Sequence, residues 1–150
     1  MIQVAAQTGQ EIADLLRGTG EGEVFQRLYA AKCAEKLLGK KPDSRIVITA
    51  PRRSGKTTEL LKYAEENHPN GQFIIVCLNH DVQQEIGRLY WEIMGKQSVG
   101  PTPPLMLTPG NLASTRGQRN PIFVDEWDAL PLETRNTILQ TGLFRAAVTS

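Results

Sequence analysis

Cysteine, net charge and long apolar runs are all scarce in this chain of 150 residues. The two cysteines, Cys33 and Cys77, indicate neither a disulfide framework nor a metal site, and Cys77 lies in an apolar run where a thiol acts as a small hydrophobe. The net charge of +1 does not indicate a nucleic-acid or membrane partner, so any such contact must come from a local patch. No run reaches membrane-spanning length and the amino terminus has no leader pattern. We therefore expect no membrane partner and a cytoplasmic location, in the host cytoplasm if a phage encodes the chain.

The composition is otherwise that of an ordinary globular domain, with 40% apolar and 22% charged residues. Two segments differ in pattern, residues 1–44 and residues 45–150. In the first, Thr8–Glu11 is typical of a capping box that opens a short helix, and a second helix is expected at 23–38. The glycines at 18–22 have the spacing of a dinucleotide fingerprint, but no strand precedes them, so we interpret them as a connector. We expect residues 1–44 to form a helical extension packed on the core.

Strands and helices alternate in residues 45–150. Strands are predicted at Ile46–Ile48, Phe73–Leu78, Leu105–Leu107, Ile122–Val124 and Phe144–Thr149. Helices are predicted at Lys56–Asn67, between an Asp81 cap and Gly95, and after Pro131. Repeated strand-then-helix units favour a parallel sheet with helices on both faces. The predicted fold class is α/β, a three-layer α/β/α sandwich preceded by the two amino-terminal helices.

The turn after the first of these strands, Ala50-Pro-Arg-Arg-Ser-Gly-Lys-Thr57, fits the Walker A pattern of phosphate-binding loops. Backbone N–H groups around Ser54 and Gly55 can hold phosphate oxygens, and Gly55 allows the close approach that this needs. Lys56 supplies a point charge, and Thr57 offers its hydroxyl to Mg²⁺ at the start of a helix. The residues expected around a bound nucleotide are Ala50, Pro51, Arg52, Arg53, Ser54, Gly55, Lys56, Thr57 and Thr58.

Two carboxylates follow the apolar strand Ile122–Val124, which matches the Walker B pattern. Asp125 would hold Mg²⁺ at the carboxyl end of that strand, beside the phosphate loop. Glu126 would polarise the attacking water as a general base. The alternative is that the pair only caps the next helix, which would be favoured if no Walker A pattern stood upstream.

Four motifs in this order resemble those of the first motor domain of superfamily 2 (DEAD-type) helicases and of phage terminase ATPases, both RecA-like (ASCE) P-loop NTPases. Ala50–Thr57 resembles motif I and Thr108–Gly110 resembles motif Ib, which touches the nucleic-acid backbone in that family. Asp125–Asp128 resembles the DEAD-type motif II, and Val148–Ser150 resembles motif III or the coupling motif. The resemblance covers about residues 45–150. It implies a RecA-like sheet and Mg²⁺-dependent ATP binding and hydrolysis in a phage-type packaging, replication or helicase-like system.

We expect a departure from that family, in which a second RecA-like domain usually supplies an arginine finger, because these 150 residues hold one such domain. Arg52 or Arg53 could act in cis, because the packaging ATPases carry an arginine in the same loop. We favour the alternative, in which a homo-oligomer or a partner subunit supplies the arginine in trans. The candidates for that role are Arg116, Arg119, Arg135 and Arg145.

A nucleic-acid contact, with DNA favoured over RNA, is expected at Thr108–Gly110 together with Lys96, Arg116 and Arg119. The alternative is an ordinary solvated loop. Two other functions remain open at this point. One is a nucleotide-dependent regulator or adaptor without motor activity, and the weaker one is a nucleotide kinase, for which no lid with paired arginines follows the phosphate loop.

Overall fold

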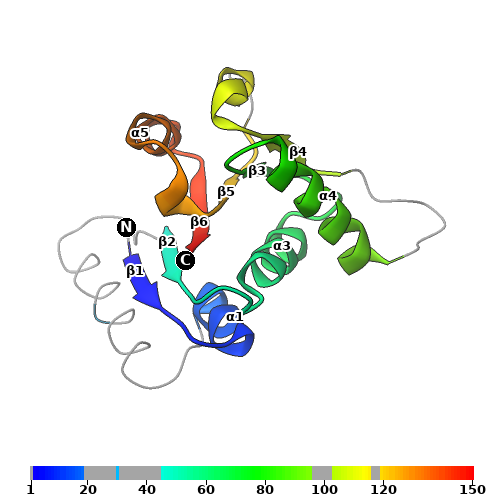
Figure 1. Ribbon diagram of the computed structural model, residues 1–150, viewed down its shortest axis with the longest axis vertical. Coiled ribbons are helices and arrows are strands. Elements are labelled where there is room, and N and C mark those ends of the chain that lie inside the picture. The colour runs from blue at the N-terminus through cyan, green and yellow to red at the C-terminus, as the bar shows by residue number, and fades with distance from the viewer. Residues whose placement is uncertain (1, 19–29, 31–44, 96–102, 116–118) are drawn as a thin grey trace.

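Six parallel strands form one sheet at the centre of the computed structural model, which describes residues 2–18, 30, 45–95, 103–115 and 119–150 (Figure 1). The strands are β1 (Ile2–Ala5), β2 (Ile46–Thr49), β3 (Ile74–Val76), β4 (Leu105–Leu107), β5 (Ile122–Asp125) and β6 (Phe144–Thr149). Their order across the sheet is β1-β2-β6-β5-β3-β4. The last strand along the chain, β6, therefore separates β2 from β5 and pairs with both.

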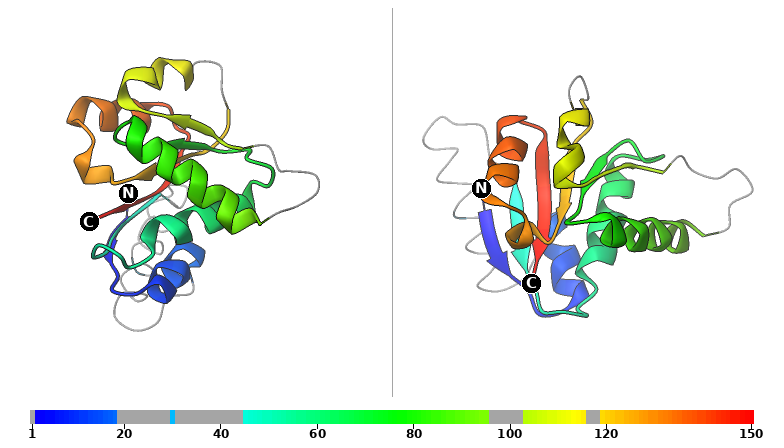
Figure 2. Two further views of the ribbon diagram at one scale, coloured as in Figure 1. Left: turned by 45° about the vertical axis from the view of Figure 1, so that its right-hand side comes forward. Right: turned by 45° about the horizontal axis from the view of Figure 1, so that its top comes forward.

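Helices cover both faces of the sheet (Figure 2). One face carries α1 (Gly9–Arg17), α3 (Lys56–Asn67) and α4 (His80–Met94), and the other carries α5 (Leu132–Gln140) with the short 3₁₀ helices η1 (Pro109–Thr115) and η2 (Trp127–Ala129). Two separate hydrophobic cores result, one on each side of the strands. The predicted three-layer α/β/α architecture with a RecA-like parallel sheet is confirmed.

The strands are apolar without alternation because both of their faces are covered. In β5, Phe123 belongs to the core under α3, whereas Ile122 and Val124 belong to the core under α5. Successive side chains of a strand point to opposite faces, so a strand in the middle layer must be apolar at every position. Phe73 and Phe123 meet edge to face at 5.8 Å between ring centroids and fill the space beneath α3.

The amino-terminal segment differs from the predicted helical extension. It begins with a strand, β1, whose residues pair with β2 from Ile2 beside Ile46 to Ala5 beside Thr49. The first predicted helix is present as α1, and its capping residue is Thr8, whose Oγ1 accepts a hydrogen bond from the Glu11 N–H at 3.2 Å. The second predicted helix, 23–38, lies outside the described residues except for position 30. β1 and α1 are therefore integral to the sheet and its core.

Parallel pairing brings the carboxyl ends of all six strands to one edge of the sheet. The loop 50–55 follows β2 at this edge and leads directly into α3. Glu126 follows β5, and Ser150 follows β6, at the same edge. Polar side chains from three strands that are adjacent in space, but far apart in sequence, thus converge there.

Candidate functional site

The loop 50–55 turns sharply because two of its residues have left-handed backbone conformations. Arg53 has φ 61° and Gly55 has φ 84°, and left-handed geometry is easily adopted only by glycine. The Ala50 N–H donates to the Thr149 carbonyl at 2.9 Å, which ties the start of the loop to the end of β6. The Ser54 N–H donates to the Pro51 carbonyl at 3.3 Å and closes the turn.

The amino end of α3 is left open to an anion. Gly55 is the N-cap residue, and it has no side chain that could bond the N–H groups of the first helical turn. The N–H groups of Lys56, Thr57 and Thr58 have no partner within the helix, because the carbonyls they would need precede its start. The Ser54 hydroxyl is buried beside them without a hydrogen-bond partner. Donors and the positive end of the helix dipole together favour a negatively charged group here.

Lys56 and Thr57 each contact one of the two carboxylates after β5. The Lys56 Nζ lies 3.4 Å from Glu126 Oε1, and the lysine side chain is only 8% exposed. The Thr57 Oγ1 donates to Asp125 Oδ1 at 2.7 Å. The fold therefore brings together the two groups of residues that the sequence predicted to share one site.

Asp125 is a buried carboxyl group with a raised pKa. Burial is the largest cause, and the nearby charge of Glu126 raises the pKa further. The hydrogen bond from Thr57 and the charge of Lys56 lower it without overcoming burial. The contacts of Asp125 therefore do not replace all of the hydration that its negative charge loses on burial. A cation bound beside it would stabilise the carboxylate form.

Glu126 is held in an uncommon geometry by the end of β6. Its φ is 57°, in the left-handed region that a residue with a side chain rarely adopts. The Ser150 N–H donates to Glu126 Oε2 at 3.1 Å, and the Ser150 Oγ donates to Oε1 at 2.8 Å. The Thr149 Oγ1 accepts from the Asp128 N–H at 3.1 Å, which holds the turn after Glu126 as well. The carboxylate of Glu126 is thus fixed while its side chain remains 31% exposed.

Comparison with known proteins does not place this chain in a family. No family model, curated protein or solved structure matches it. Among the described residues, no helix is long and apolar enough to span a membrane. The described residues also contain no group of three or more His, Cys, Asp or Glu side chains placed to hold a metal ion. The two groups that the sequence predicted to bind Mg²⁺, the Thr57 hydroxyl and the Asp125 carboxylate, lie 2.7 Å apart.

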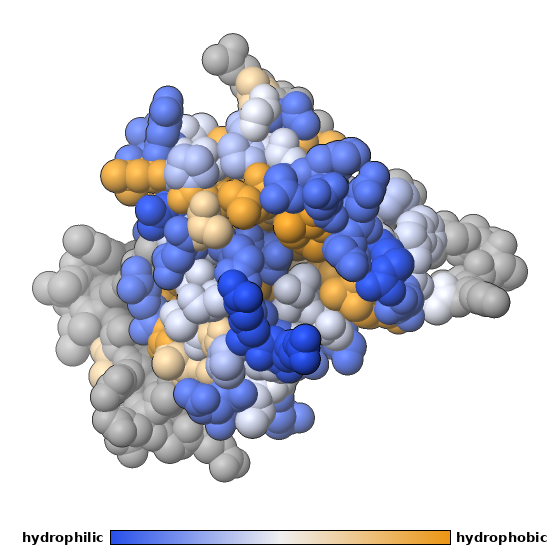
Figure 3. Space-filling model, in the orientation of Figure 1, coloured by the Kyte–Doolittle hydropathy of each residue, from blue (hydrophilic) through white to orange (hydrophobic). Residues whose placement is uncertain are grey.

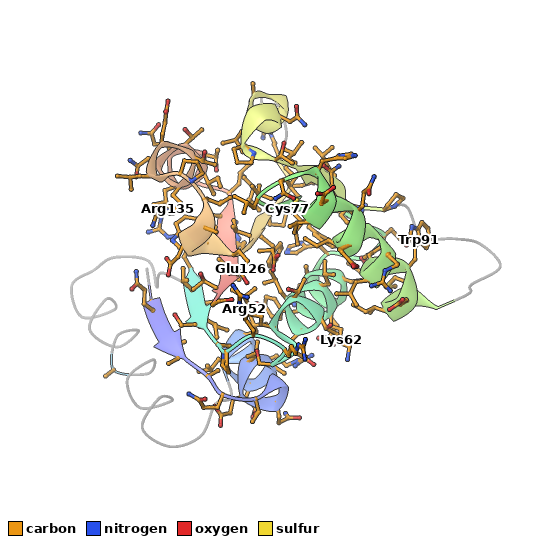
Figure 4. All side chains as sticks on the ribbon, in the orientation of Figure 1. Arg52, Lys62, Cys77, Trp91, Glu126 and Arg135 are labelled. Atoms are coloured by element: carbon orange, nitrogen blue, oxygen red, sulfur yellow. The ribbon has the colours of Figure 1, made fainter. Side chains whose placement is uncertain are left out.

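The remaining loop residues predicted to bind a nucleotide surround this centre. Ala50 is buried, whereas Pro51, Arg52 and Arg53 are exposed on the outer side of the turn. Strongly hydrophilic side chains lie at the centre of the face in Figure 3, over the turn between β2 and α3. Figure 4 shows Arg52 and Glu126 in the same central part of the molecule.

The predicted nucleic-acid contact is not assembled in one place. Thr108–Gly110 follows β4 at the carboxyl edge of the sheet, whereas Arg119 precedes β5 and lies at the opposite edge. Lys96 and Arg116 lie outside the described residues. The structure therefore brings Thr108–Gly110, but not Arg119, to the edge where the loop 50–55 lies.

Two further residues at the carboxyl edge have structural roles. Asn79, not the predicted Asp81, caps α4, because its Oδ1 accepts from the Val82 N–H at 3.0 Å. Cys77 is buried, and burial, followed by the charge of Asp125, raises its pKa to about 11. Its thiol donates to the Leu107 carbonyl at 3.5 Å, so Cys77 is a protonated packing residue at neutral pH.

Sequence reasoning missed the contribution of the amino terminus to this edge. The turn from β1 to α1 lies beside the loop 50–55, and the contact is between Gly9 and the Ser54 carbonyl. The alternation in Ile2–Ala5, followed by the Thr8 cap, could have indicated a strand-to-helix unit.

Proposed function

We propose that this chain binds Mg·ATP and hydrolyses it, as a RecA-like P-loop ATPase working within a nucleic-acid-processing system. One observation carries the proposal. Lys56 and Thr57, at the uncapped start of α3, meet Glu126 and Asp125 at the end of β5. A buried lysine, two carboxylates and an open helix terminus are the groups that phosphoryl transfer from a magnesium nucleotide needs.

The residues present fit a magnesium triphosphate. The phosphate part suits the N–H groups of the first turn of α3, the unpaired Ser54 hydroxyl and the Lys56 ammonium. The metal suits the oxygen pair of Thr57 and Asp125, because Mg²⁺ is bound through few protein oxygens and keeps water and phosphate oxygens as other ligands. The raised pKa of Asp125 also agrees with a site designed for a cation.

Each side chain has a distinct task in hydrolysis. Bound Mg·ATP supplies the phosphoryl group and a divalent charge beside its oxygens. Lys56, which pairs with Glu126 in the free protein, turns to the phosphate oxygens and stabilises the charge that develops there. Glu126, which Ser150 holds in place, orients a water molecule and accepts its proton.

The fixed geometry of Glu126 favours hydrolysis over a purely nucleotide-dependent adaptor. An adaptor needs nucleotide affinity but no ordered base, whereas three contacts from Lys56 and Ser150 hold this carboxylate. The nucleic-acid role rests on the motif resemblance and on the Thr108–Gly110 turn, which is half-buried except for the exposed Gly110 and shares the carboxyl edge with the site. DNA is the polymer we favour.

Titration calorimetry with Mg·ADP, and ATP turnover with and without single- or double-stranded DNA or RNA, test this function. We expect saturable, Mg²⁺-dependent binding and a slow turnover that DNA accelerates. Binding without turnover under every condition would favour the adaptor. Failure to bind any magnesium nucleotide would overturn the proposed function.

A further inference from the structure

The first residue of α1, Gly9, lies directly against the loop 50–55. β1 places it there, because β1 runs parallel to β2 and the Ala6 N–H donates to the Thr49 carbonyl at 2.8 Å. A Cβ atom at position 9 would lie 3.2 Å from the Ser54 carbonyl oxygen. That distance is tighter than an ordinary van der Waals contact, so only glycine lets α1 approach this closely.

The contact between Gly9 and the Ser54 carbonyl also affects the direction of the Gly55 N–H group. The carbonyl of Ser54 and the N–H of Gly55 belong to one planar peptide unit, in which they point in opposite directions. The amino end of α1 carries partial positive charge and attracts the carbonyl oxygen that lies against it. The N–H of Gly55 is consequently turned away from α1.

We propose that Gly9 is a positioning residue for the phosphate loop. Because Gly9 has no side chain, α1 can hold the Ser54–Gly55 peptide so that the Gly55 N–H is directed at the bound phosphate. The inference rests on the proposed function, because it assigns a nucleotide ligand to this loop. It also gives the amino-terminal segment a role. The β1–α1 unit supports the loop from the side opposite the ligand.

α1 cannot easily retreat from an added side chain. Its apolar face, Ile12, Leu15 and Leu16, is buried in the core under the sheet. At its other end Arg17 makes two hydrogen bonds to the Glu66 carboxylate of α3, at 2.8 and 2.9 Å. A methyl group at position 9 must therefore displace the Ser54 carbonyl by a few tenths of an ångström.

The test compares Gly9→Ala and Gly9→Val with the control Gly87→Ala. Position 87 lies in α4, and a Cβ there would meet the Met106 Cε at 3.7 Å, an ordinary contact. We expect the Kd for Mg·ADP to rise about tenfold in Gly9→Ala, and further in Gly9→Val, because displacements of ångström scale cost about a hundredfold. The Kd of Gly87→Ala should equal that of the wild type. The thermal midpoint of Gly9→Ala should not fall, since alanine favours helix more than glycine does.

Each other outcome is decisive. If Gly9→Ala binds Mg·ADP like the wild type while Lys56→Ala does not bind, the inference is wrong and the proposed function stands. If Gly9→Ala loses affinity and thermal stability together, Gly9 is a structural residue and the inference is again wrong. If the wild type itself does not bind Mg·ADP, the proposed function fails, and the role assigned to Gly9 fails with it.

Discussion

Lys56 and Asp125 are charged side chains that the fold buries at one edge of the sheet, and this has a cost. Transfer of a charge out of water is unfavourable unless partners replace its hydration. Lys56 has Glu126 at 3.4 Å, and among the described residues Asp125 has the Thr57 hydroxyl at 2.7 Å. Charged residues buried at a cost in stability are typical of functional sites, which agrees with the proposed binding of Mg·ATP.

Replacement of Lys56 by alanine should abolish Mg·ATP binding or turnover, because it removes the cation nearest the phosphate site. A phosphate loop suggests an open lysine from sequence, but the Lys56 side chain is buried and pairs with Glu126. The variant therefore also leaves Glu126 without its counter-charge. Turnover and circular dichroism measure the two effects. Lys62→Ala is the control, since Lys62 is exposed on the same helix and pairs with Glu59 at 3.8 Å. Turnover at the wild-type level in Lys56→Ala would refute the site.

Asp125→Asn should raise thermal stability in the absence of ligand while weakening Mg²⁺-dependent nucleotide affinity. Burial raises the Asp125 pKa above its ordinary value of 3.8, so the folded protein binds this proton more tightly than the unfolded chain. The wild type therefore loses stability as pH rises from that value through the raised pKa, and the asparagine variant does not. The difference in thermal midpoint should grow between pH 4 and pH 7. Asp128→Asn, at an exposed position, is the control, and an equal gain there would contradict the assignment.

Glu126→Gln should retain Mg·ATP binding and lower turnover by about two to four orders of magnitude, as expected for loss of a general base. Glutamine can accept from the Ser150 N–H with its single amide oxygen and donate from its NH2 group to the Ser150 Oγ, so the turn after β5 should persist. Calorimetry and single-turnover kinetics separate the two effects. Loss of binding would assign Glu126 a metal-binding or structural role.

At the scale of secondary structure, strong local patterns were enough to predict most elements. α3 and β6 have the predicted bounds, because apolar periodicity and an apolar run define them without help from distant residues. β1 was missed because four residues carry little signal, and its partner β2 lies more than forty residues further on. The cap of α4 was placed two residues late, since Asn79 and Asp81 are both good caps and only the backbone decides between them.

The candidate site also has parts that local sequence predicts and parts that depend on residues far apart in the chain. The loop 50–55 and the pair after β5 are contiguous motifs, so sequence could predict them. The bracing of Glu126 by Ser150 depends on β6 lying between β2 and β5. The approach of Gly9 to Ser54 depends on the pairing of β1 with β2, which the short alternation in Ile2–Ala5 does not specify.

Ser150→Ala should lower turnover about tenfold and leave the Kd for Mg·ADP unchanged. The variant loses the hydroxyl that donates to Glu126 at 2.8 Å, a hydrogen bond to a charged group, but keeps the Ser150 N–H contact. Glu126 would then sample other positions and orient water less often. Thr137→Ala serves as the control, because the Thr137 hydroxyl donates to the Glu133 carbonyl within α5. A rise in Kd without a change in turnover would show that Ser150 acts on binding instead.

At the scale of the whole molecule, the sheet separates two groups of arginines. Arg52 and Arg53 are exposed on the loop 50–55, at the carboxyl edge. Arg145, near the start of β6, lies at the opposite edge, where burial, followed by the charge of Arg145, lowers the pKa of His68 at the end of α3. An arginine from that edge could reach the site of a second copy in a reciprocal two-fold dimer, or in head-to-tail contacts that close into a ring or continue as a filament.

The sequence alone favoured an arginine in trans, but the exposure of Arg52 and Arg53 on the loop 50–55 leads us to expect instead that one of them acts in cis. An arginine placed against the developing charge is worth about three to five orders of magnitude in rate. The test measures turnover per chain over a range of protein concentrations for the wild type, Arg52→Ala and Arg53→Asn. Asparagine suits position 53 because it tolerates the left-handed conformation found there.

Activity per chain should stay constant on dilution in the cis arrangement, and one of the two variants should lose most of its rate. Addition of that variant to the wild type should not lower the wild-type rate, because each chain completes its own site. The opposite result has an equally clear meaning. If activity per chain rises as copies associate, and if Arg119→Ala or Arg145→Ala poisons the wild type in mixtures, the arginine comes from a neighbouring subunit. The assembly of copies would then be the functional ATPase, because no single copy could bring an arginine from the far edge of its sheet to its own phosphate loop.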